Sequence, residues 1–290
     1  MTARGASDRR AVVITGASTG IGEACALRLD TMGYHVFAGV RRDEDGAALQ
    51  QKASARLTPL RLDVTDDAQV AAAAERVGAA VGETGLAGLV NNAGVAVAGP
   101  LEFLPVAELR RQLEVNVVAQ LAVTQAFLPL LRQGSGRIVN MGSISGKLAS
   151  PFMGPYSASK FAMEALSDAL RLELRPWGID VVLIEPGGIA TPIWERSVDV
   201  ADRLIAQLPP KALDYYGKVI PAIRGFALRT GKNGAPVSTV SDAVAEAFLA
   251  HHPRARYYVG PRAGLSTRVI SRLPERMRDR LIAGQLPTYP

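Results

Sequence analysis

Residues 11–22 read Ala-Val-Val-Ile-Thr-Gly-Ala-Ser-Thr-Gly-Ile-Gly, and this stretch decides the fold that we expect. Its first part, Ala11–Thr15, is a continuous apolar run typical of a strand buried on both faces. The glycines at 16, 20 and 22 then predict a turn, and a helical pattern runs from Glu23 to about Met32. The spacing is Gly-x-x-x-Gly-x-Gly rather than Gly-x-Gly-x-x-Gly. A strand, a glycine turn and a helix in this order let the backbone approach a pyrophosphate at the helix N-terminus.

The rest of the chain alternates short apolar runs with helical patterns. We expect further strands at Gly33–Val40, Leu57–Leu62, Leu86–Val90, Arg137–Met141, Ile179–Ile184 and Tyr257–Val259. We expect helices at Ala68–Val81, Leu109 to about Leu131, Tyr156–Glu173 and Ser241–Ala250. Strands separated by helices of this length imply right-handed βαβ units and a parallel sheet. The sequence therefore predicts an α/β fold with about seven strands.

The composition is that of an ordinary soluble globular protein. It has 290 residues, 48% hydrophobic and 21% charged, which is ample for one core and short for two full domains. The single cysteine, Cys25, excludes an internal disulfide framework and a cysteine-based metal site. Three histidines are too few and too clustered for a metal site, so we predict none.

The termini and the charge suggest neither a membrane nor a nucleic-acid partner. The opening residues are polar, and no run approaches about 18 uninterrupted apolar residues, so we expect no signal peptide, no transmembrane helix and a cytoplasmic location. The net charge is +6, and many arginines lie late, at Arg254, Arg256, Arg262, Arg268, Arg272, Arg276, Arg278 and Arg280. Because no aromatic-interleaved or helix-turn-helix pattern accompanies them, we interpret residues 262–290 as a basic, solvated C-terminal extension rather than a nucleic-acid surface.

The end of the second strand bears on which nucleotide the chain would bind. In dinucleotide folds an acidic residue here accepts from a ribose 2′-hydroxyl, whereas an arginine suits a 2′-phosphate. Val40 occupies the acidic position and Arg41 follows it, which favours NADP(H) over NAD(H). NAD remains possible, because the acidic residues 43–45 could neutralise Arg41, and the two arginines at 41 and 42 could simply be solvated.

A tyrosine and a lysine are spaced for proton transfer. Pro155 marks a helix start, and Tyr156 and Lys160 follow at i and i+4, which places their Cβ atoms about 5–6 Å apart on one helix face. A neighbouring ammonium favours the phenolate, and lowering the phenol pKa by about 3 units corresponds to roughly 4 kcal/mol. That would make Tyr156 a usable acid or base. Ser143 follows a predicted strand, where its hydroxyl could hydrogen-bond a substrate oxygen.

Two further features have more than one interpretation. Asn116 lies inside an apolar helical stretch, as either a satisfied core amide or a bulge-forming functional residue. Residues 192–236 break the alternation and mix aromatic and apolar residues with prolines and glycines. Their place beyond the sixth strand predicts a partly helical lid over a bulky, apolar substrate; the alternative is a surface subdomain that packs on itself.

Together these residues resemble the short-chain dehydrogenase/reductase family. The matching motifs are Thr15-Gly16-x-x-x-Gly20-x-Gly22, Asp63, Asn91-Asn92-Ala93-Gly94, Asn116, Ser143, Tyr156-x-x-x-Lys160 and Pro186-Gly187 through Thr191. The likeness covers Val12 to Thr191 with the final helix and strand. Glu185-Pro186-Gly187, the Trp177-Gly178-Ile179 turn and the long lid resemble the retinol and hydroxysteroid dehydrogenase branch.

The resemblance implies a single Rossmann-type, doubly wound domain and assigns its site residues. Catalytic roles fall to Asn116, Ser143, Tyr156 and Lys160, with Lys160 lowering the Tyr156 pKa and Asn116 holding a water in a proton relay. Cofactor contacts fall to Gly16, Ser18, Thr19, Gly20, Ile21, Gly22, Arg41, Asp63, Val64, Asn92, Ala93, Gly94, Tyr156, Lys160, Pro186, Gly187, Ile189 and Thr191.

The resulting prediction is an oxidoreductase that transfers a hydride between NADP(H) and an alcohol or carbonyl substrate, bulky and apolar like a retinoid, a steroid or a long-chain compound. One alternative is a reductase of small polar ketones or 3-oxoacyl thioesters, which the lid residues Lys211, Lys218, Arg224 and Lys232 would suit. Another is a nucleotide-sensing protein without turnover. The apolar helices around Asn116 and after Tyr156 predict a homodimer or homotetramer.

Overall fold

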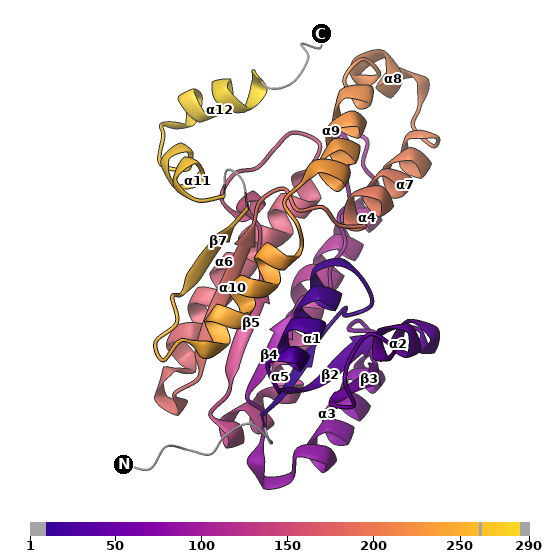
Figure 1. The fold of residues 1–290 in the computed structure, drawn as a ribbon. Helices are drawn as coiled ribbons and strands as arrows, with labels where there is room; N and C mark the ends of the chain where they lie inside the picture. The colour runs from indigo at the N-terminus through magenta and orange to yellow at the C-terminus, as the bar shows by residue number, and fades with distance from the viewer. Residues whose placement is uncertain (1–9, 261–262, 285–290) are drawn as a thin grey trace.

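A computed structural model describes residues 10–260 and 263–284 as a parallel sheet with helices on both faces (Figure 1). The sheet order is β3-β2-β1-β4-β5-β6-β7, and all neighbouring strands are parallel. The strands are β1 (Ala11–Ile14), β2 (His35–Val40), β3 (Leu57–Arg61), β4 (Gly88–Asn91), β5 (Arg137–Met141), β6 (Asp180–Pro186) and β7 (Arg256–Val259). The strand order reverses between β1 and β4, which confirms the predicted doubly wound α/β fold.

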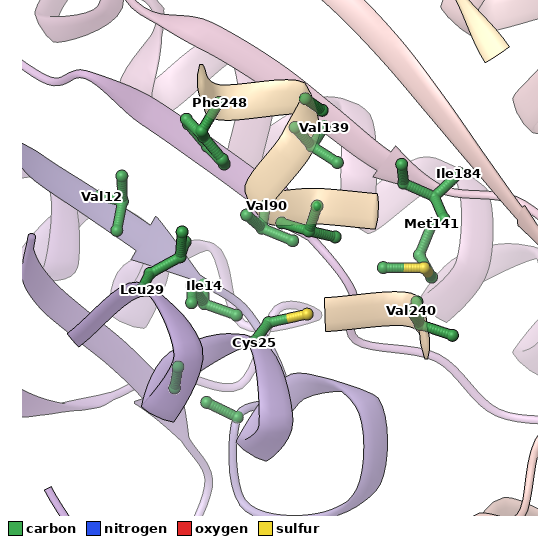
Figure 2. Packing of buried hydrophobic residues seen from close by; sticks show 14 of the residues in the cluster. Val12, Ile14, Cys25, Leu29, Val90, Val139, Met141, Ile184, Val240 and Phe248 are labelled. Atoms are coloured by element: carbon green, nitrogen blue, oxygen red, sulfur yellow. The ribbon is translucent and has the colours of Figure 1, made fainter. Parts of the chain in front are cut away.

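Alternation along β1 divides the core between the two faces of the sheet. Val12 and Ile14 join a fully buried cluster under α1 (Gly20–Thr31) and α10 (Ser238–Leu249), shown in Figure 2. Val13 faces the opposite cluster, which includes residues of α3 (Asp67–Val81) and α5 (Ala119–Gly134). Each face of the sheet is therefore covered, which explains why β1 is apolar at every position.

Cys25 lies within the first of these clusters. Its sulfur points into the packing between α1 and α10 (Figure 2), and burial raises the pKa of the thiol to about 12. The thiolate, the reactive form, is therefore strongly disfavoured. Cys25 serves packing rather than chemistry.

The remaining helices include one that the sequence did not predict. α2 (Asp43–Gln50) follows β2, and only Gly46 and Leu49 are buried along it, so its apolar periodicity is too weak to indicate a helix. α6 (Gly154–Glu173) packs on β6, and short 3₁₀ turns cover Gly82–Thr84 (η1), Ile144–Gly146 (η3) and Arg175–Trp177 (η4).

The helix expected from Leu109 to Leu131 is longer and interrupted. It consists of α4 (Val106–Leu113), a π-helical turn η2 (Glu114–Val118) and α5. By length and composition alone, the run Val106–Gly134 could cross a membrane. Here it packs against β4, α3 and α6, as a core helix does.

Three helices follow β6 and rise beyond the carboxyl ends of the strands (Figure 1). They are α7 (Ile193–Ile205), α8 (Pro210–Tyr216) and α9 (Ile220–Asn233), and α7 packs against α9. Two more helices, α11 (Leu265–Ile270) and α12 (Glu275–Ala283), occupy the segment expected to be a basic extension. Arg262, residues 285–290 and the polar opening at 1–9 lie outside the described residues.

Candidate functional site

The glycine turn after β1 has a backbone that only glycine supports. Gly16 and Gly20 have φ of +64° and +63°, a region that residues with a Cβ avoid. A Cβ on Gly22 would lie 2.2 Å from the Gly16 carbonyl oxygen. The turn therefore keeps the start of α1 free of side chains, and Thr19 at the N-cap makes no side-chain cap either.

The ends of β1 and β4 are held together by one hydroxyl and one amide. Thr15 Oγ1 accepts from the backbone N–H groups of Asn92 at 2.9 Å and Ala93 at 3.0 Å. In return, Asn92 Nδ2 donates to the carbonyls of Thr15 and Gly16, both at 3.0 Å. These bonds fix the glycine turn against the loop after β4 at the point where the strand order reverses.

A cavity of about 850 Å³ opens at this edge of the sheet. All of the residues assigned to the cofactor and to catalysis from the sequence line this one cavity, from Gly16 through Arg41, Asn116 and Tyr156 to Thr191. The structure thus brings the whole predicted set together. The cavity extends from the start of α1, which has no side-chain cap, to Arg41 at the end of β2. Its size and these two ends fit an extended dinucleotide.

Ser143, Tyr156 and Lys160 meet at the centre of this cavity. Ser143 begins η3, and its hydroxyl hydrogen-bonds the phenol of Tyr156 as well as accepting from the Ser145 N–H at 3.1 Å. Lys160 Nζ lies 5.6 Å from the centre of the Tyr156 ring and donates to the Met141 carbonyl at 2.7 Å. Pro155 in the first turn of α6 places both side chains on one helix face, as the spacing predicts.

The pKa of Tyr156 differs from the expectation. Burial raises it above its ordinary value, and the hydrogen bond from Ser143 only partly opposes this. Burial also lowers the pKa of Lys160 to about 8. The prediction that Lys160 lowers the Tyr156 pKa is therefore not met in the protein alone, because burial of the phenol is the larger effect and the Lys160 ammonium donates to the Met141 carbonyl.

Asn116 combines the two interpretations that the sequence left open. It lies in the π turn η2, so the helix does bulge there, and its amide is satisfied. Nδ2 donates to the Val95 carbonyl at 3.0 Å and to Ser159 Oγ at 3.2 Å, while Oδ1 accepts from the Val95 N–H at 2.9 Å. The side chain therefore holds the loop after β4 to α6, and its part in a proton relay stays a prediction.

Two glutamines share this task and were missed by the sequence analysis. Gln112 Oε1 accepts from the Val97 N–H at 2.7 Å and its Nε2 donates to the Val95 carbonyl at 2.9 Å. Gln120 Nε2 donates to the Ala93 carbonyl. Both are buried. The signal was present, because three amides recur every four residues, at 112, 116 and 120, and therefore share one face of the helix.

At the other end of the cavity, Arg41 is exposed and makes no ion pair with any residue that the structure describes. The neighbouring acids are engaged elsewhere. Arg42 binds Asp45 at 2.7 Å and lies 3.9 Å from Glu44, while Arg61 binds Asp43 at 3.2 Å. The acidic residues therefore compensate the other arginines and leave the charge of Arg41 available at the cavity wall.

The segment expected to form a lid contributes apolar side chains to the cavity wall. Trp194 packs edge-on against Phe226, with ring centres 6.3 Å apart, which joins α7 to α9. Tyr216 at the end of α8 packs edge-on against Phe152 and donates to Glu102 at 2.9 Å. Because Phe152 belongs to the loop before Tyr156, α8 is anchored beside the proposed catalytic group.

Metal ligands are not grouped in the part of the chain described here. Residues 10–260 and 263–284 contain no cluster of three or more histidine, cysteine, aspartate or glutamate side chains that could hold an ion.

Comparison with known proteins shows which proteins the chain resembles. The sequence model of the family described as short chain dehydrogenase matches residues 10–201. The chain is 39% identical to an NADPH-dependent 3-dehydrocapnine reductase of Ornithobacterium rhinotracheale over 277 residues, covering 94% of this chain and 95% of that protein. It is also 39% identical to retinol dehydrogenase 5 of Mus musculus (95% and 88% covered) and to 11-beta-hydroxysteroid dehydrogenase type 2 of Oryctolagus cuniculus (94% and 69% covered).

The fold has solved counterparts. A crystal structure of a short chain dehydrogenase/reductase from Burkholderia phymatum in complex with NAD superposes with a TM-score of 0.77 at 26% identity, covering 98% of both chains. Relatives named for NADPH and for NAD therefore both occur, and together they support a nicotinamide cofactor for this site.

Proposed function

Because the chain belongs to the short-chain dehydrogenase/reductase family, within a branch that includes retinol and hydroxysteroid dehydrogenases, we propose that it interconverts a bulky, apolar alcohol and the corresponding carbonyl compound with NADP(H). Membership makes it an NAD(P)-dependent oxidoreductase that acts on CH–OH groups. The observation that carries the proposal is the meeting of Ser143, Tyr156 and Lys160 in the cavity that begins at the glycine turn.

Each of the three central side chains has a proposed part in proton transfer. The bound nicotinamide supplies or accepts the hydride. Ser143 holds the substrate oxygen, and Tyr156 gives that oxygen a proton during reduction or removes one during oxidation. Lys160 lies beside the tyrosine ring, and its ammonium stabilises negative charge on the phenol oxygen as the proton leaves.

The cofactor preference is proposed from Arg41. Its guanidinium lines the cavity and makes no ion pair with the described residues, whereas the acids around it are bound to Arg42 and Arg61. A 2′-phosphate would give Arg41 the anion that the protein does not provide. Arg41→Ala should therefore weaken NADPH binding about tenfold and leave NADH binding unchanged, since one charged hydrogen bond contributes about 1.5 kcal/mol. Equal effects on the two nucleotides would contradict the preference.

The substrate class is proposed from the walls of the lid. Trp194, Ile205, Ile223 and Phe226 line the cavity beyond Tyr156. Of the four basic lid residues that would suit a polar substrate, only Arg224 lines the cavity, and it is bound to Asp202 at 3.2 Å. Two other lid arginines, Arg196 and Arg229, also line the cavity, and Arg196 contacts Thr19 at the glycine turn. The apolar wall beyond Tyr156 favours a substrate that is large and hydrophobic.

A substrate panel tests this proposal. Nicotinamide absorbance is followed with retinoids, steroids, long-chain aldehydes and short 3-oxo compounds, each with NADPH and with NADH. We expect turnover with bulky apolar compounds and NADPH. Turnover confined to short 3-oxo compounds would overturn the substrate class. Tight nucleotide binding without turnover of any compound would favour a nucleotide-sensing role.

We also propose a homodimer or homotetramer. Exposed apolar side chains lie on the helices that the sequence analysis singled out, with Val118 at 53%, Phe161 at 45% and Leu172 at 66% exposed. Exposed apolar groups gathered on neighbouring helices are typical of a surface that another copy covers. Light scattering after size-exclusion chromatography measures the assembly directly; a monomeric protein would contradict the proposal.

A further inference from the structure

One arginine of the lid reaches the glycine turn and has no role in the account above. Arg196 lies in the first turns of α7, and its Nη2 donates to Thr19 Oγ1 at 3.3 Å. Thr19 is the N-cap residue of α1, and both residues line the cavity. The contact joins residues 177 positions apart, so it links the lid directly to the cofactor turn.

The charge of Arg196 is not compensated by the protein. Its guanidinium makes no ion pair with the residues that the structure describes. Its field reaches Asp45, but that carboxylate already accepts two hydrogen bonds from Arg42, at 2.9 and 2.7 Å. Among the residues that the structure describes, Arg196 therefore hydrogen-bonds only a neutral hydroxyl, and it lines the cavity that begins at the glycine turn.

The first turn of α7 is held on the loop after β6. Trp194 Nε1 donates to the Ile189 carbonyl at 2.8 Å, and Ser197 Oγ donates to the Trp194 carbonyl at 2.8 Å. On the other side, a Cβ at Gly20 would lie 3.5 Å from Cδ of Pro192, at the root of α7. The start of α7 therefore lies close to Gly20, and Arg196 contacts Thr19 from there.

We propose that Arg196 binds the pyrophosphate of the nicotinamide cofactor, together with the backbone N–H groups of the turn at Thr19. Arg41, at the end of β2, binds the 2′-phosphate. The two arginines therefore bind different phosphates of the cofactor. Because the lid and the glycine turn would hold the same pyrophosphate, helices α7–α9 become better ordered when the cofactor binds. This inference depends on nicotinamide binding alone and holds whatever the substrate.

The test compares Arg196→Gln with Arg203→Gln as a matched control. Arg203 lies on the same helix and is exposed, but it does not line the cavity. Dissociation constants are measured by calorimetry for NADPH, NADH and 2′-AMP, which carries a 2′-phosphate and no phosphate at the 5′ position. Arg196→Gln should weaken NADPH and NADH alike, each about tenfold, because both lose one charged hydrogen bond. Its affinity for 2′-AMP should be unchanged, and Arg203→Gln should bind all three nucleotides as the parent does.

Hydrogen exchange of α7–α9 gives a readout independent of affinity. Saturating NADPH should slow exchange across these helices in the parent and in Arg203→Gln, and should slow it less in Arg196→Gln, with Arg196→Lys in between. If Arg196→Gln binds NADPH and NADH as tightly as the parent does, Arg196 contacts only Thr19 and the proposal is overturned. Weaker binding of NADPH and 2′-AMP, with NADH binding unchanged, would also overturn the proposal, because it would assign Arg196 to the 2′-phosphate.

Discussion

Lys160→Met should make the cofactor-free protein more stable while removing its activity. Lys160 is only 8% exposed, and it makes no ion pair with the described residues. Burial lowers its pKa from 10.5 to about 8, and a difference of this size means that holding the charge at pH 7 costs about 3 kcal/mol. Methionine has a similar length and no charge. Loss of the hydrogen bond to Met141 costs about 1–2 kcal/mol, so the expected gain is about 1–2 kcal/mol.

The pH dependence provides a check on this cause. The folded-state pKa of Lys160 lies below the unfolded value, so between about pH 8 and 10.5 the unfolded chain binds more protons than the folded one. This group therefore makes the parent more stable as pH rises through that window. The methionine variant lacks this contribution, and its advantage should shrink between pH 7 and pH 10.

Urea unfolding of both proteins without nucleotide, at pH 7 and at pH 10, measures the two effects. The same preparations are assayed for hydride transfer, which should fall by orders of magnitude. A variant that is less stable than the parent at pH 7 would refute the reasoning. So would an advantage that does not change with pH, because the gain would then not come from the buried charge.

Three further substitutions test other parts of the structure. Gly22→Ala brings a Cβ to 2.2 Å from the Gly16 carbonyl oxygen. We expect the free energy of unfolding in urea to fall by about 1–3 kcal/mol, and nucleotide binding to weaken in calorimetry. An unchanged free energy of unfolding and an unchanged affinity would contradict this geometry. Burial and Glu164 raise the pKa of Glu185 from 4.5 to about 8. The free energy of unfolding of the parent should therefore fall as pH rises from 4.5 to about 8. In urea unfolding, the free energy of unfolding of Glu185→Gln should depend less on pH over this range. Phe161→Glu places a charge on an exposed apolar face and should shift the assembly towards monomers in light scattering; an unchanged mass would assign the interface elsewhere.

The sheet could be predicted from the sequence because its strands carry a strong local signal. β1 is buried on both faces, so Val12 and Val13 both had to be apolar, and the glycines after them permit the positive φ angles of the turn that follows. α2 carries no comparable signal, since only Gly46 and Leu49 are buried along it. The sequence shows an element clearly where burial is extensive, and poorly where the element lies at the sheet edge.

The members of the site were predictable, but their electrostatics were not. Helix spacing alone places Tyr156 beside Lys160, and the structure agrees. The pKa values depend on burial and on where Lys160 Nζ points, and these come from β5 and α6 packing together. Arg196 was missed for a related reason, since its contact with Thr19 bridges segments that no local pattern connects.

The central claim, that Tyr156 is the acid and base of a nicotinamide-dependent oxidoreductase, is tested most directly with Tyr156→Phe. Nucleotide affinity is measured by calorimetry, and turnover by nicotinamide absorbance, with a substrate that the parent accepts. We predict an unchanged affinity for NADPH and a loss of turnover on the order of 10²–10⁴-fold, the usual contribution of a positioned acid or base. Turnover close to that of the parent, with NADPH bound equally well, would contradict the claim.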